Sequence, residues 1–106
     1  MQDKITQILK AISDPTRREL FHVLLIASTA MPISQLASKH PISRQGITKH
    51  LKVLNEAGLI SIESSGRERY CSADAAPLKE VQKWLGFYQQ FWDDKLDHLG
   101  TYLENS

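Results

Sequence analysis

The 106-residue chain has a single cysteine, Cys71, and no long apolar run. One cysteine can form neither an intrachain disulfide nor a multi-thiolate metal cluster within one chain. No segment approaches the roughly 20 apolar residues that a membrane-spanning helix needs, and the first residues lack the basic and apolar pattern of a secretion signal. We therefore expect a cytoplasmic protein without a membrane partner.

Catalytic motifs are also lacking. The sequence has no glycine-rich phosphate loop, no nucleophile elbow, and no spacing of His with Cys or carboxylates that is typical of a catalytic set. Its length fits one domain, 1–106, and 42% hydrophobic residues suffice for one modest core. These features predict a non-enzymatic domain without a cofactor, and no small-molecule effector is identifiable.

The most informative absence is that of acidic residues from Leu20 to Asn55, a stretch that holds Lys39, Arg44, Lys49 and Lys52. The formal net charge is only +1, but residues 1–73 carry ten Lys or Arg against six Asp or Glu, whereas residues 74–106 carry three against six. A basic surface without carboxylates suits contact with phosphates. The charge distribution therefore predicts a double-stranded DNA partner.

Two helical patterns lie in residues 33–60, on either side of Pro41-Ile42. Each is opened by a serine, Ser34 or Ser43, which we expect to cap free backbone N–H groups. Two helices joined in this way form a helix-turn-helix layout.

The second helix, about residues 43–57, has an aliphatic stripe and an opposite polar face. Gln side chains can pair with adenine in the major groove, and Arg or Lys with guanine. The residues expected near bases are Ser43, Arg44, Gln45, Thr48 and Lys49. Lys39 and Lys52 suit phosphates. His50 fits either a phosphate donor or a half-buried structural histidine, and Gly46 either a close approach to DNA or a tight helix crossing.

The sequence resembles the ArsR/SmtB family of winged-helix repressors over nearly its whole length. The matching segments are Ser13-Asp14-Pro15-Thr16-Arg17-Arg18, then Ser43 to Leu54 followed by Glu56-Ala57-Gly58-Leu59-Ile60, and Gly66-Arg67-Glu68-Arg69-Tyr70. The resemblance implies a mainly α fold of about five helices with a small two-stranded β-hairpin, the wing. It also implies a homodimer formed by the first and last helices.

The first helix is predicted over residues 3–12, followed by a helix that starts at Pro15 with Ser13 or Asp14 as its cap. Arg17 and Arg18 fit either phosphate contacts or a solvated helix start with local ion pairs. Residues 27–32 are expected to form a loop, and a short supporting helix follows over about residues 34–40.

The wing is predicted over residues 60–72, with a turn at Ser64-Ser65-Gly66. Arg67 is the residue expected in a minor groove. Arg69 suits the DNA backbone or, alternatively, a cross-strand pair with Glu63. Cys71 is interpreted as a small core residue, with oxidant sensing as the alternative.

The last helix is predicted over about residues 76–103, with a near-heptad apolar stripe that one small domain does not need for its own core. A twofold dimer would cover it and place two recognition helices about 34 Å apart, which predicts an inverted-repeat operator. The expected dimer contacts are Ile5, Ile8, Leu85, Tyr88, Trp92, Leu96 and Leu99.

The main functional hypothesis is a homodimeric repressor of its own promoter region, similar to the metal-independent, autorepressor-like branch of the family. Relatives that sense soft metals carry cysteines on the supporting helix, where this chain has Ser34-Gln35-Leu36-Ala37-Ser38. No metal site is predicted. One alternative is a zinc-type sensor that uses Asp94, Asp97 and His98 across the dimer. Another is a protein-interaction module that uses the aromatic last helix.

Overall fold

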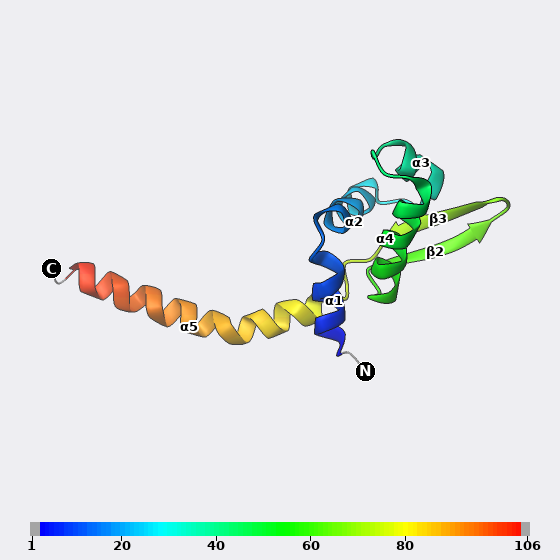
Figure 1. Cartoon of the computed structure of the whole chain (residues 1–106). Coiled ribbons are helices and arrows are strands. Elements are labelled where there is room, and N and C mark those ends of the chain that lie inside the picture. The colour runs from blue at the N-terminus through cyan, green and yellow to red at the C-terminus, as the bar shows by residue number, and fades with distance from the viewer. Residues whose placement is uncertain (1–2, 105–106) are drawn as a thin grey trace.

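Residues 3–104, which the computed structural model describes, form five helices and one three-stranded sheet (Figure 1). In chain order the elements are α1 (Lys4–Ile12), α2 (Pro15–Ala27), β1 (Met31–Pro32), α3 (Ile33–Ser38), α4 (Arg44–Glu56), β2 (Ile60–Ser65), β3 (Glu68–Ala73) and α5 (Leu78–Glu104). The predicted winged helix-turn-helix fold is confirmed: α3 and α4 form the helix pair, and β2 and β3 form the wing.

Side-chain caps fix the starts of three helices. Asp3 accepts a hydrogen bond from the Thr6 N–H at 2.8 Å, and Asp14 accepts one from the Arg17 N–H at 3.0 Å. Ser43 accepts one from the Gly46 N–H at 3.1 Å. The predicted cap for α3 is wrong, because this helix already begins at Ile33 and Pro32 precedes it without a side-chain bond.

The sheet has the antiparallel order β1-β3-β2. Strand β1 corrects the prediction of a loop through residue 32, since Met31 pairs with Cys71 and Pro32 with Tyr70. Two residues are too few to show an alternating pattern in a sequence.

The wing turn is tighter than predicted. Ser65 pairs with Glu68, so that only Gly66 and Arg67 connect the strands, and Gly66 has a φ of 64°. A positive φ at the first residue of a two-residue hairpin turn strongly favours glycine. Ser64 and Ser65 therefore belong to β2.

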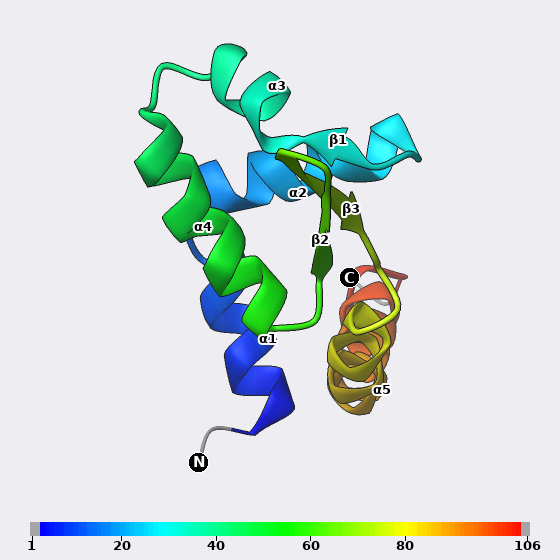
Figure 2. The same cartoon turned by 90° about the vertical axis from the view of Figure 1, so that its right-hand side faces the viewer.

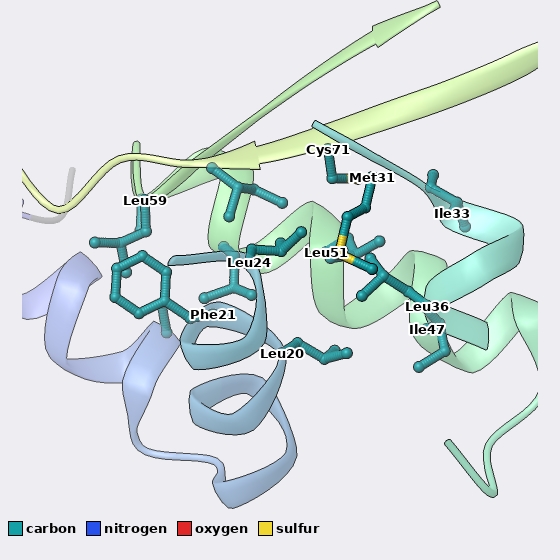
Figure 3. Close-up of a cluster of buried hydrophobic side chains, with 14 of the residues drawn as sticks. Leu20, Phe21, Leu24, Met31, Ile33, Leu36, Ile47, Leu51, Leu59 and Cys71 are labelled. Atoms are coloured by element: carbon teal, nitrogen blue, oxygen red, sulfur yellow. The ribbon is translucent and has the colours of Figure 1, made fainter. Parts of the chain in front are cut away.

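The core lies between α1–α4 and the sheet (Figure 3). Ile47, Leu51 and Leu54 on α4 are fully buried, as the sequence pattern predicts. They meet apolar side chains of the supporting elements, including Leu20, Leu24, Leu36 and Cys71. Ile8 is also fully buried within the protomer. Because it has no surface left to cover, we correct its assignment to the dimer interface.

Only the beginning of α5 packs on this core. Leu78 and Val81 contact it, and beyond them the helix extends away from the body from a point next to α1 (Figure 1). Figure 2 looks nearly along α5 and shows the other elements gathered to one side of it. The protomer therefore measures 68 × 31 × 22 Å. None of the helices within residues 3–104 combines the length and apolar character needed to cross a bilayer.

Candidate nucleic-acid interface

One outward side of α4 carries the polar residues predicted to contact DNA. Arg44, Gln45, Lys49 and Lys52 are exposed and Thr48 is half-buried; we call these five residues the recognition face. Four of them, all except Lys52, line one open hollow on the surface. The buried stripe of the same helix packs on the core, so the fold holds this face outward.

Two side-chain hydrogen bonds stabilise the first turn of α4. Ser43 caps it, and the Thr48 hydroxyl donates a hydrogen bond to the Arg44 carbonyl at 2.9 Å. Since a hydroxyl oxygen also has acceptor capacity, Thr48 can still accept a hydrogen bond from a base. Ser43 is exposed but already engaged as the cap.

Gly46 is required by packing inside the protein. A Cβ on this residue would lie 2.6 Å from Cγ2 of Ile42, the side chain of the preceding turn. The structure thus gives a reason for this glycine that differs from both predicted ones: close packing against the turn between α3 and α4, with no crossing of two helices involved.

His50 lies half-buried near the start of α2. The pKa of Asp14 is lowered, first by the hydrogen bond from the Arg17 N–H and then by the charges of Arg17 and His50. His50 is therefore close to a structural cap, which favours its interpretation as a structural histidine.

Arg17 and Arg18 have a role that the sequence analysis missed. Arg17 Nε donates to the Ala11 carbonyl at 2.7 Å and Nη2 to the Lys10 carbonyl at 3.0 Å. Arg18 Nη1 donates to the Ile12 carbonyl at 2.7 Å. Both arginines thus satisfy carbonyls at the C-terminal end of α1, where cations are favoured. The Ser13-Asp14-Pro15 sequence signals a helix start, but not that the next residues cap the preceding helix.

The three basic residues outside α4 that were predicted to contact DNA lie near α3 and on the wing. Lys39 is exposed at the end of α3, and Arg67 and Arg69 are exposed on the wing. The predicted alternative pair of Arg69 with Glu63 is wrong, since Glu63 lies opposite Tyr70 and Ser64 opposite Arg69. Neighbouring residues of a strand point to opposite faces, so these two side chains do not meet.

Glu68 was not singled out from the sequence, yet it lies at the centre of a polar cluster. Its Oε1 lies 3.2 Å from Arg44 Nη2 and accepts a hydrogen bond from the Arg69 N–H at 3.2 Å. Its Oε2 accepts one from the Ser34 hydroxyl at 2.9 Å. The bond from Ser34, the bond from the Arg69 N–H and the charge of Arg44 keep the pKa of Glu68 below its ordinary value.

The residues considered for sensing lie apart from this surface. Within residues 3–104 of one protomer, no three His, Cys, Asp or Glu side chains come together as a potential metal site. Asp94, Asp97 and His98 are exposed on α5. Cys71 is buried, and burial raises the pKa of its thiol to about 11, which suppresses the reactive thiolate.

Comparisons with known proteins agree with this geometry. A family model described as "Helix-turn-helix domain" matches residues 12–63, from the last residue of α1 into β2. The solved structure of an ArsR-like transcriptional regulator from Rhodococcus sp. RHA1 is 31% identical to this chain. It superposes with a TM-score of 0.76, over 97% of this chain and 93% of that one. The chain belongs to the ArsR family of winged helix-turn-helix transcriptional regulators.

Two relatives of this ArsR-family regulator are similar over most of their lengths. The transcriptional repressor SdpR of Bacillus subtilis is 32% identical over 81 residues, which cover 76% of this chain and 88% of SdpR. The HTH-type transcriptional regulator Rv2034 of Mycobacterium tuberculosis is 31% identical over 96 residues, which cover 91% and 85%. Family and fold make the protein a transcriptional regulator with a helix-turn-helix DNA-binding domain, a class that is not normally enzymatic.

Proposed function

We propose that this ArsR-family protein is a homodimeric repressor that binds an inverted-repeat operator in its own promoter region without needing a metal. The observation that carries the proposal is the recognition face, which the fold holds outward in a stretch without Asp or Glu from Leu20 to Asn55. The similarity to SdpR, which is named a transcriptional repressor, supports repression.

In this proposal α4 enters the major groove. Gln45 pairs with an adenine, and Arg44 or Lys49 with a guanine, each contact contributing about 1–3 kcal/mol of discrimination. Ser43 and Thr48 complete the base-side contacts. Lys39 and Lys52 bind phosphates and set the register, and Arg67 enters the neighbouring minor groove from the wing turn, with Arg69 on the backbone.

The dimer is proposed from the apolar surface of α5. Ten of the twelve exposed large hydrophobic residues of the described structure lie on this helix, and Trp92 is 66% exposed. An apolar face of this length on a lone protomer calls for a partner, and a second copy is the simplest one. The proposed contacts are Ile5 on α1 and Leu85, Tyr88, Trp92, Leu96 and Leu99 on α5.

Selection from a random duplex library with the wild-type protein tests this function. We expect enrichment of an inverted repeat whose half-site centres lie about one helical turn, roughly 10 base pairs, apart. Failure to enrich any sequence would contradict the proposed operator binding.

A fluorescence-anisotropy titration then locates the operator and tests for a metal. The DNA upstream of the protein's own gene should bind more tightly than scrambled DNA, equally in chelator and in added zinc. Release by zinc would instead point to Asp94, Asp97 and His98 as a sensing site. No preference for the upstream DNA would contradict autoregulation.

A further inference from the structure

Glu68 joins three elements of the DNA-binding surface. It is the first residue of β3, directly after the wing turn, and its carboxylate contacts Ser34 on α3 and Arg44 at the start of α4. With the Arg69 N–H, these contacts use both carboxylate oxygens. A single side chain thereby connects the wing to both helices of the helix-turn-helix.

The position of this carboxylate is unfavourable for simple attraction to DNA. A negative charge beside a phosphate-binding surface opposes binding. Nor does stability explain it well, because an ion pair with an exposed partner contributes little to folding, and the Arg44 side chain is 58% exposed. A role in recognition accounts better for a charge at this place.

The contact with Glu68 leaves most hydrogen-bond donors of the Arg44 side chain unused. The guanidinium group has five N–H donors in a planar fork. Within the described residues, its side-chain hydrogen bonds use only Nη2, on Glu68 Oε1. The remaining donors stay available to a base while the contact restricts the rotamers of the side chain. Such preorganisation reduces the entropy lost on binding.

We propose that Glu68 is a positioning residue for DNA specificity: held in place by Ser34 and the Arg69 N–H, its carboxylate orients the Arg44 guanidinium for a base. The inference rests on the proposed role of α4 and the wing in DNA binding. It means that the carboxylate lowers affinity for any DNA, through its charge, while it raises the preference for the operator.

The test compares Glu68→Gln with Glu63→Gln in operator and scrambled duplexes. Both changes remove one negative charge from the same hairpin, but Glu63 lies exposed on β2 and makes neither of the contacts that Glu68 makes with Ser34 and Arg44. Both variants should bind scrambled DNA more tightly. Only Glu68→Gln should lose preference, with an operator-to-scrambled affinity ratio about tenfold below that of the wild type.

A second comparison tests whether the effect passes through Arg44. In an Arg44→Ala background, Glu68→Gln should change the ratio by less than about twofold, because the oriented group is gone. A full tenfold loss in that background would overturn the assignment to Arg44. Equal thermal melting curves of all variants establish that the fold is retained.

The outcomes separate this inference from the proposed function. If the wild-type protein selects an operator but Glu68→Gln keeps the same ratio as Glu63→Gln, the positioning role of Glu68 is overturned and the repressor function stands. If the wild type selects no sequence at all, operator binding fails, and the role of Glu68 fails with it.

Discussion

Cγ2 of Ile42 lies 2.6 Å from the point that a Cβ on Gly46 would occupy. The turn between α3 and α4 thus packs closely on the first turn of α4. The N–H of Gly46 also donates a hydrogen bond to the capping hydroxyl of Ser43. The start of the recognition helix is therefore set by packing of the protein on itself.

Gly46→Ala should destabilise the protein. Alanine is the better helix former by about 1 kcal/mol, but a Cβ at this distance overpacks the site at a cost of typically 1–3 kcal/mol. We expect a net loss of up to about 2 kcal/mol in the free energy of unfolding, measured by urea denaturation.

The control is the same change at Gly100 on α5, where a Cβ meets nothing within 4 Å. Gly100→Ala should leave stability equal or higher. In addition, Ile42→Ala should reduce the cost of Gly46→Ala. Equal effects at Gly46 and Gly100 would show that the clash is absorbed without cost.

Arg17→Ala should destabilise the protein without altering DNA binding by the folded form. The change removes two hydrogen bonds to the end of α1, and at about 0.5–1.5 kcal/mol each the loss is roughly 1–3 kcal/mol. Arg17→Lys should not recover it, because an ammonium group cannot form the same fork. A lower salt dependence of DNA affinity in Arg17→Ala would restore the phosphate-contact hypothesis.

Trp92→Glu should separate the proposed dimer while the protomer stays folded, since Trp92 is 66% exposed and outside the core. Sedimentation equilibrium should show at least a hundredfold weaker association, together with weaker operator binding. The matched control is Gln90→Glu, which adds the same charge on the opposite side of α5 at about 100° per residue. Retention of the dimer in Trp92→Glu would refute the proposed interface.

Lys52→Ala and Gln45→Ala should affect DNA binding in different ways. Loss of the Lys52 charge should weaken binding to all sequences and reduce the salt slope by about one. Loss of Gln45 should weaken operator binding only, by roughly 1–3 kcal/mol, with an unchanged slope. Binding isotherms at four or five salt concentrations distinguish them, and identical slopes in both variants would remove Lys52 from the phosphate contacts.

Cys71 should resist thiol reagents in the folded protein and react after unfolding in urea. Its pKa also gives stability a pH dependence. Because the folded value of about 11 lies above the ordinary 9.0, the unfolded state loses its proton first. The stability of the wild type relative to Cys71→Ala should therefore be constant below about pH 9 and decline between 9 and 11. Rapid labelling of the native protein near neutral pH would revive the redox hypothesis.

Elements whose structure depends on neighbouring residues in the chain could be predicted from the sequence. The α4 stripe, the cap Ser43, the glycine of the wing turn and the long α5 each follow from residue spacing or from a residue with one favoured conformation. For α2 the sequence narrowed the cap to Ser13 or Asp14, and the structure shows Asp14. The outward position of Gln45, Lys49 and Lys52 follows from the same periodicity.

Features that depend on contacts between distant segments could not be predicted in this way. The short β1 exists because it lies beside β3. Ser34 looked like a cap because serines commonly are, yet its hydroxyl binds Glu68, 34 residues away. Ile8 fits an interface stripe by periodicity, but the direction in which that stripe packs is set by the tertiary structure.

The extended α5 has a consequence for the control of gene expression. Held by the core only at its first turns, most of this helix lacks the packing from which helices in proteins gain their stability. If a second copy supplies that packing, helix formation and assembly occur together, and the amount of dimer at low abundance grows with the square of the protomer concentration. Occupancy of the promoter by such a protein would then rise steeply with the number of its own copies in the cell.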